Sequence, residues 1–171
     1  LLCALLTQMV SAAETTEIVE TDEEIRVKCS EVLEAVINKT TGVMTFEVTG
    51  EINLSVDAMG ETTFAPFSDY IKQVIFPLQL RSIKHDLFAG CTRLERIELS
   101  VNISYIGENA FKGCTSLERI ELPASISSID YSAFEGCTSL KEVFIPAGLR
   151  RLEPYAFTRC SSLTRFVVDP E

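Results

Sequence analysis

Cysteine is the residue whose number and spacing most invite a chemical role in this chain. Six cysteines occur, and Cys91, Cys114, Cys137 and Cys160 follow one another at intervals of 23 residues. In an exported chain, cysteines ordinarily form disulfides. The single histidine, His85, could also pair with Cys91 as base and nucleophile.

The even spacing argues against these chemical roles. Equivalent positions of a repeat stack at about one strand spacing, roughly 4.8 Å, whereas a metal site needs ligands that converge on one point. We therefore expect the four cysteines to form a column of buried thiols that satisfy backbone groups, with disulfides as the alternative. Cys29 lies outside this column. We expect no metal and no cofactor.

The carboxylates of Glu98 and Glu121 also recur in register and could imitate the acid pair of a glycosidase. Arginine neighbours and open solvent would keep both ionised, and no cleft is implied. His85 falls on an outer turn beside Asp86. The sequence therefore predicts that the protein is not an enzyme.

Composition narrows the class of protein. The chain has 171 residues, of which 46% are apolar and 23% charged, and its formal net charge is −10. Such a chain can form a core, which excludes disordered and collagen-like classes. The acidity argues against nucleic-acid binding, which needs clustered Lys and Arg.

The elements that would position these residues repeat every 23 residues. Apolar columns accompany the cysteines from residue 68 to the end of the chain. In the segment that starts at Cys114, for example, they are Leu117, Ile120, Leu122, Ile126, Ile129 and Phe134. The residues around Ile120 alternate in polarity as in a short strand, Pro123 ends it, and an Ala-Phe pair before a glycine suits one helical turn.

One such coil cannot bury its apolar side alone, but stacked coils can. We expect a right-handed repeat solenoid with a parallel β-sheet on one face and short helical turns on the other side. Four complete coils and a truncated fifth exceed the minimum of about three.

The run from Gly113 to Pro123, together with Ile129 and residues 133–137, resembles the 23-residue leucine-rich repeat of BspA-like proteins. The resemblance covers residues 68–171. It implies a surface or secreted protein of a bacterium or protist, with a role in adhesion. Upstream, the turn at residues 38–42 and the strand at 43–48 resemble the β-hairpin that precedes the first coil in this family, although Ala35-Val36 replaces an aromatic residue.

Four segments are expected. Residues 1–13 read as the remnant of a signal peptide, with an amphipathic or buried helix as the alternative. Residues 14–30 are expected to be an acidic linker, since residues 14–34 hold eight acidic and two basic residues. Residues 31–67 would form the N-terminal β-hairpin cap, and residues 68–171 the repeats. A helix over residues 22–37 is the alternative near the cap.

No cap follows the last coil, so we expect the chain to be a fragment of a longer protein; end-to-end association is the alternative. Membrane contact is expected only through export or through an anchor outside this fragment.

Side chains on the strand face would contact a protein or glycan partner, with host extracellular matrix as a candidate. The expected binding residues are Arg96, Glu98, Arg119, Glu121, Phe144 and Arg165. Cross-strand pairing alone could also explain these arginines. The function expected is adhesion by a secreted or cell-surface module; the alternative is a passive spacer that displays a domain beyond residue 171. Possible glycosylation sites are Asn38, Asn53 and Asn102.

Overall fold

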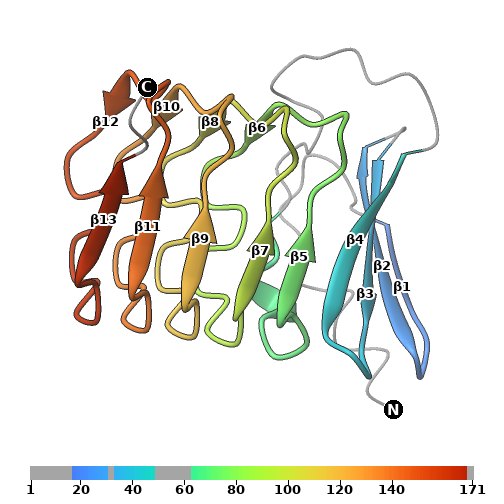
Figure 1. The fold of residues 1–171 in the computed structure, drawn as a ribbon. Helices are drawn as coiled ribbons and strands as arrows, with labels where there is room; N and C mark the ends of the chain where they lie inside the picture. The colour runs from blue at the N-terminus through green and yellow to red at the C-terminus, as the bar shows by residue number, and fades with distance from the viewer. Residues whose placement is uncertain (1–16, 31–32, 49–62, 169–171) are drawn as a thin grey trace.

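The chain forms a solenoid of stacked parallel strands that continues directly from an N-terminal antiparallel sheet (Figure 1). The computed structural model describes residues 17–30, 33–48 and 63–168. The expected signal-peptide remnant and the sequon at Asn53 lie outside these residues.

The N-terminal sheet has four antiparallel strands in chain order. They are β1 (Ile18–Glu20), β2 (Glu24–Ser30), β3 (Leu33–Asn38) and β4 (Val43–Val48). Every second residue of β2, namely Ile25, Val27 and Cys29, is buried in the core. The acidic linker expected over residues 14–30 is therefore wrong for residues 18–20 and 24–30, which form paired strands.

The hairpin expected before the first coil is present as β3 and β4. Its turn is held by Asn38, whose Oδ1 accepts hydrogen bonds from the amides of Thr40 (3.1 Å) and Thr41 (2.8 Å). The alternative of a helix over residues 22–37 is wrong, because β2 and β3 pair with each other across this range.

Each coil of the solenoid contributes a front strand, and the first four coils also contribute a shorter back strand. The front strands are β5 (Gln73–Ile75), β7 (Arg96–Glu98), β9 (Arg119–Glu121), β11 (Glu142–Ile145) and β13 (Arg165–Val168). The back strands are β6 (Ser82–Ile83), β8 (Tyr105–Ile106), β10 (Ser128–Ile129) and β12 (Arg151–Leu152). Paired residues are offset by 23 positions, as in Ser82 and Tyr105, so the expected repeat is the structural repeat.

The hairpin joins the front sheet because β4 pairs in parallel with β5. This gives a six-stranded sheet in the order β1-β2-β3-β4-β5-β7, while β9, β11 and β13 form a separate sheet. The four back strands form one continuous sheet. The N-terminal sheet thereby covers the apolar end of the first coil, as terminal repeats do in solenoids.

A stack of phenylalanine rings fills the interior. Phe88, Phe111, Phe134 and Phe157 follow each other with ring centroids 5.2–5.5 Å apart. Phe64 adds a rung that the 23-residue spacing did not reveal, since it lies 24 residues before Phe88 and stacks on it at 5.2 Å. Phe64, which lies in the segment assigned to the cap, thus belongs to the stack.

Turns, rather than helices, close most coils on the side away from the front strands. Among the described residues the only helix is a 3-10 helix, η2 (Ala65–Phe67). In the later coils, turn bonds such as Cys114 N–H to Phe111 O (3.2 Å) replace it. The short helical turns expected on this side are therefore mostly single hydrogen-bonded turns, and η2 is the one helix among the described residues. No helix in the described ranges is long and apolar enough to span a bilayer.

Candidate binding surface on the strand face

The front strands present their outward side chains on one surface, which we call the strand face. The central residue of each inner strand is buried, as for Val74, Ile97, Ile120 and Val143, so its two neighbours point to solvent. The strand face comprises Gln73, Ile75, Arg96, Glu98, Arg119, Glu121, Glu142, Phe144, Arg165 and Val167. All six predicted binding residues lie on it.

Arg96 is the least engaged charged residue of the strand face. It is exposed, and its guanidinium forms no ion pair with the described part of the chain. Its strand neighbour Glu98 accepts a hydrogen bond from Gln73 Nε2 (2.5 Å). Arg96 is therefore available to an anionic group of a partner.

Arg119 joins two neighbouring strands. Its guanidinium pairs with Glu121 on β9 and lies over the ring of Phe144 on β11, with 5.0 Å between Cζ and the ring centroid. Phe144 is half-buried. The stacked pair forms a pre-organised apolar and cationic spot, which is the chemistry enriched at protein interfaces.

Two further ion pairs cross the later strands. Arg165 Nη1 lies 2.8 Å from Glu142 Oε1 without hydrogen-bond geometry, and Lys141 Nζ lies 3.1 Å from Glu118 Oε2. Lys141 and Glu118 were absent from the predicted site. Both residues directly precede a front strand, and they are 23 residues apart. Their opposite charges at equivalent repeat positions could have predicted this pair.

The cysteine column lies inside the solenoid, where Cys91, Cys114 and Cys137 are buried and Cys160, the last, is half-buried. Cys91, Cys114, Cys137 and Cys160 carry free thiols, as expected. Cys114 Sγ donates to Phe88 O (3.3 Å), and Cys137 Sγ donates to Phe111 O (3.3 Å). Burial raises the pKa of Cys91 and of Cys137 to about 12.

This environment favours a structural role for the thiols. A nucleophilic cysteine needs a lowered pKa and access to substrate, and Cys91 has neither. His85 is exposed on the outer turn, where it was expected. In the described residues no three His, Cys, Asp or Glu side chains are grouped as metal ligands.

A polar cluster on the back sheet was not predicted. Tyr105 Oη donates to Asp130 Oδ2 (2.7 Å), and Arg151 Nη2 lies 3.9 Å from Asp130 Oδ1. Burial and the Asp130 carboxylate raise the pKa of Tyr105 to about 12, while the hydrogen bond from Tyr105 lowers the pKa of Asp130. These contacts join Tyr105 on β8 and Arg151 on β12 to Asp130, the residue directly after β10, so the three side chains are partnered within the fold.

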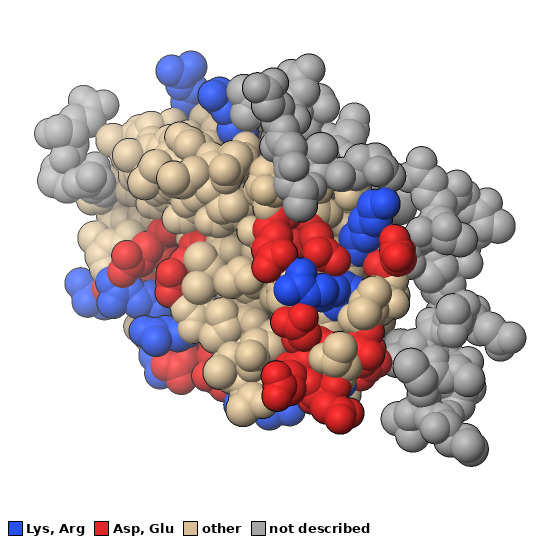
Figure 2. All heavy atoms as spheres, turned by 90° about the vertical axis from the view of Figure 1, so that its right-hand side faces the viewer, with Lys and Arg blue, Asp and Glu red and all other residues tan. Residues whose placement is uncertain are grey.

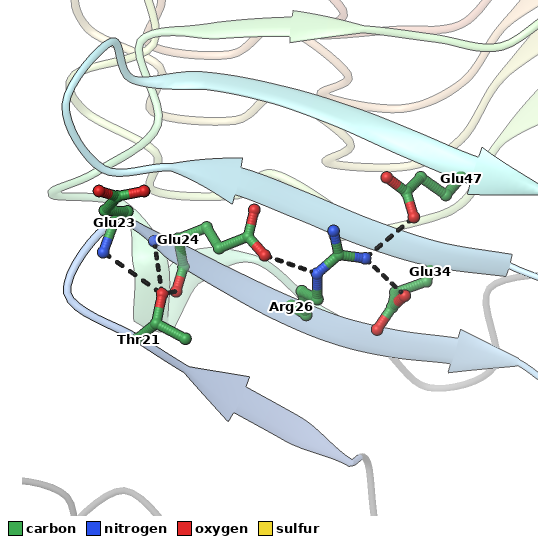
Figure 3. A network of polar contacts seen from close by, with 6 residues as sticks. All are labelled: Thr21, Glu23, Glu24, Arg26, Glu34 and Glu47. Atoms are coloured by element: carbon green, nitrogen blue, oxygen red, sulfur yellow. Dashed lines mark hydrogen bonds and ion pairs between the residues drawn. The ribbon is translucent and has the colours of Figure 1, made fainter.

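Acidic residues gather on the outer side of the N-terminal sheet, as Figure 2 shows. At its centre Arg26 bonds to Glu24 (2.7 Å), Glu34 (3.1 Å) and Glu47 (2.9 Å), so that β2, β3 and β4 are joined (Figure 3). The bond to Glu24, followed by that to Glu47, raises the pKa of Arg26 further above its ordinary value. The Arg26 guanidinium and the three carboxylates thus bind each other, and their contacts stabilise the register of the three strands.

The two sequons in described segments lie on surface turns. Asn38 is exposed at the hairpin turn, and its side-chain oxygen is occupied by backbone amides. Asn102 is also exposed, but its Nδ2 donates to Leu78 O (2.7 Å). Glycosylation of Asn102 would require that this bond break, so Asn38 is the more accessible position.

The model of the "BspA type Leucine rich repeat region" matches residues 51–171 in six copies. This match begins before residue 68, where the first coil was expected, in accord with the stacking of Phe64 on Phe88. No curated protein matches the chain.

Several solved structures are similar. A leucine-rich repeat protein from Bacteroides ovatus ATCC 8483 is 35% identical, with a TM-score of 0.55, over 57% of this chain and 25% of its own. A leucine-rich cell surface protein from Faecalibacterium prausnitzii A2-165 is 25% identical, with a TM-score of 0.61, over 83% of this chain and 41% of its own. The leucine-rich repeat protein of T. pallidum is 25% identical, with a TM-score of 0.59, over 80% of this chain and 69% of its own. The chain thus spans less than half the length of the first two.

Proposed function

The chain belongs to the BspA-type leucine-rich-repeat family, and we propose that it is a secreted or surface-displayed binding module that attaches to a protein or glycan through its strand face. The observation that carries this proposal is the stacked pair of Arg119 and Phe144 beside Arg96, which forms no ion pair with the described residues, on one exposed sheet. Leucine-rich-repeat proteins commonly bind proteins and often lie at the cell surface. One similar structure is described as a cell surface protein.

The strand face offers a rigid array of charged and aromatic groups at the spacing of the strands. Arginine and aromatic side chains dominate the energetics of many interfaces. Host extracellular matrix is a candidate source of partners for such a module. In family and fold the protein is a leucine-rich-repeat solenoid, a class that generally lacks enzymatic activity, and the absence of activity in this chain stays a prediction.

Charge reversal on the strand face tests the proposal. The triple variant Arg96→Glu, Arg119→Glu and Arg165→Glu should weaken binding to a captured partner at least tenfold. The matched control carries Arg81→Glu, Arg150→Glu and Arg159→Glu, which make the same change in net charge at exposed positions away from this face. Unchanged affinity in the first variant, with both variants folded, would refute the proposal.

A passive spacer is the second candidate. The ion pairs of Arg119 with Glu121 and of Arg165 with Glu142 favour this function. They give two of the three strand-face arginines a role within the sheet, so that no ligand is needed to explain them. In that case the repeats would display a functional domain beyond residue 171. A folded sample that binds no surface, matrix or glycan ligand would favour this function.

A further inference from the structure

The front sheet is interrupted at one coil junction. Strands β5 and β7 form a ladder, as do β9, β11 and β13, but β7 and β9 lie side by side without one (Figure 1). At the junction of β5 and β7, Phe76 N–H donates to Glu98 O (3.0 Å) and Arg96 N–H donates to Lys72 O (3.2 Å). One coil later, the equivalent bonds would run from Leu99 N–H to Glu121 O and from Arg119 N–H to Glu95 O. Neither bond is present in the described chain.

The same two coils remain joined elsewhere. On the back, β8 and β10 form a ladder. At the turns, Phe111 N–H donates to Ala133 O (2.8 Å) and Gly113 N–H donates to Glu135 O (2.7 Å), so bonding continues between these two coils. The rings of Phe111 and Phe134 also stack across this junction, with centroids 5.3 Å apart and planes within 10° of parallel. The interruption is therefore confined to the strand side.

Side-chain charge accounts for this location. Residues one repeat apart stand opposite each other on adjacent front strands, as Gln73 does with Arg96. Across β7 and β9 the repeat places three pairs of like charge opposite each other, namely Glu95 and Glu118, Arg96 and Arg119, and Glu98 and Glu121. Like charges directly opposite each other destabilise strand pairing.

The other junctions hold complementary or neutral pairs. Between β9 and β11, Lys141 pairs with Glu118 at 3.1 Å. Between β11 and β13, Arg165 lies 2.8 Å from Glu142, and Phe144 faces Val167. The ladder is thus absent where like charges accumulate and present at the other front junctions.

We propose that the junction of β7 and β9 is a hinge, at which the coils separate on the strand side while the back sheet and the phenylalanine stack hold them together. Motion there changes the spacing of Arg96 and Arg119 and therefore the shape of the strand face. Backbone groups that lack a ladder partner are satisfied by water and open at low cost. The hinge follows from the pairing pattern alone and does not depend on the binding function proposed above.

Amide hydrogen exchange with single-residue resolution tests the hinge. The amides of Leu99 and Arg119 should exchange at least tenfold faster than their equivalents Phe76 and Arg96, after correction for intrinsic rates. Raising the salt concentration screens the repulsion between exposed charges, so it should slow exchange at Leu99 and Arg119 and leave Phe76 unchanged. Equal protection at both junctions would overturn the proposal.

A charge swap supplies the matched variant. Arg96→Glu with Glu98→Lys keeps the net charge and places opposite charges against Arg119 and Glu121, so protection at Leu99 and Arg119 should rise severalfold. The converse control, Lys141→Glu with Glu142→Lys, places like charges against Glu118 and Arg119 and should open the junction of β9 and β11. If neither swap moves protection at its junction, charge does not set the hinge.

Discussion

Ser100 occupies a column that holds proline in other coils, at Pro77, Pro123 and Pro146. It is buried, and its hydroxyl has no hydrogen-bond partner. Its backbone amide also donates no hydrogen bond in the described part of the chain, so a proline ring would displace none.

Ser100→Pro should therefore stabilise the fold by about 1 kcal/mol, because it restricts the unfolded chain and removes a buried unpaired hydroxyl. Thermal unfolding checks this. Ser100→Ala is the control, since it removes the hydroxyl without restricting the backbone and should give a smaller gain. A lower melting temperature for the proline variant would contradict the prediction.

The buried thiols predict how stability depends on alkaline pH. The folded pKa of Cys91 and of Cys137 is about 12, whereas a cysteine in an unfolded chain titrates near pH 8.5. A raised folded pKa means that stability is fully present below the unfolded value and is lost as pH rises, because only the unfolded chain then releases the protons. Each thiol should cost roughly 1.4 kcal/mol per pH unit within this window.

Denaturant unfolding at pH 8, 9 and 10 measures the effect. Cys137→Ala should weaken the pH dependence while it lowers stability at pH 8 through lost packing. The thiols should also resist alkylation at pH 8 until the protein unfolds. Rapid alkylation of the folded protein would show that the column is open.

The docking of the hairpin on the first coil is an element that depends on one glycine. Gly42 has φ +74°, and its carbonyl accepts bonds from the amides of Lys72 (2.8 Å) and Gln73 (3.1 Å). A Cβ atom at Gly42 would lie 2.8 Å from Cγ of Lys72. The hairpin turn therefore sits against the coil with no room for a side chain.

Gly42→Ala should destabilise the protein by about 1–2 kcal/mol, through backbone strain together with the displacement of Lys72. Gly90→Ala is a matched control, because Gly90 has φ +77° and a Cβ there meets nothing within 4 Å. Chemical denaturation of both variants separates strain from contact. Equal losses of stability would show that the contact with Lys72 costs nothing.

The sequence predicted the coils well and the N-terminal strands poorly. Each coil follows from side-chain periodicity, which fixes the strand, the buried columns and the outward residues together. In β2 the same two-residue alternation was present, since Ile25 and Val27 alternate with Glu24 and Arg26. The acidic composition of residues 14–34 favoured a linker, so this alternation was not interpreted as a strand. The Arg26 network could not be foreseen because it depends on the pairing of three strands.

At the scale of the whole molecule, the predicted binding residues share one face because a single repeat places them there. Their pairings were not predictable in detail, since the ring of Phe144 under Arg119 depends on side-chain conformations across two coils. The missing ladder between β7 and β9 could not be predicted from the sequence either, because it also depends on contacts between two coils. Charge columns were visible in the sequence, but their effect on the ladder was not.

The most direct test of the central claim is binding of the protein to a panel of extracellular-matrix proteins and glycans at low and high salt. A strand face that attaches through Arg96, Arg119 and Arg165 should give saturable binding that weakens as salt screens the charges. A folded sample that binds none of the panel at low salt, or that binds equally well at high salt, would contradict the account.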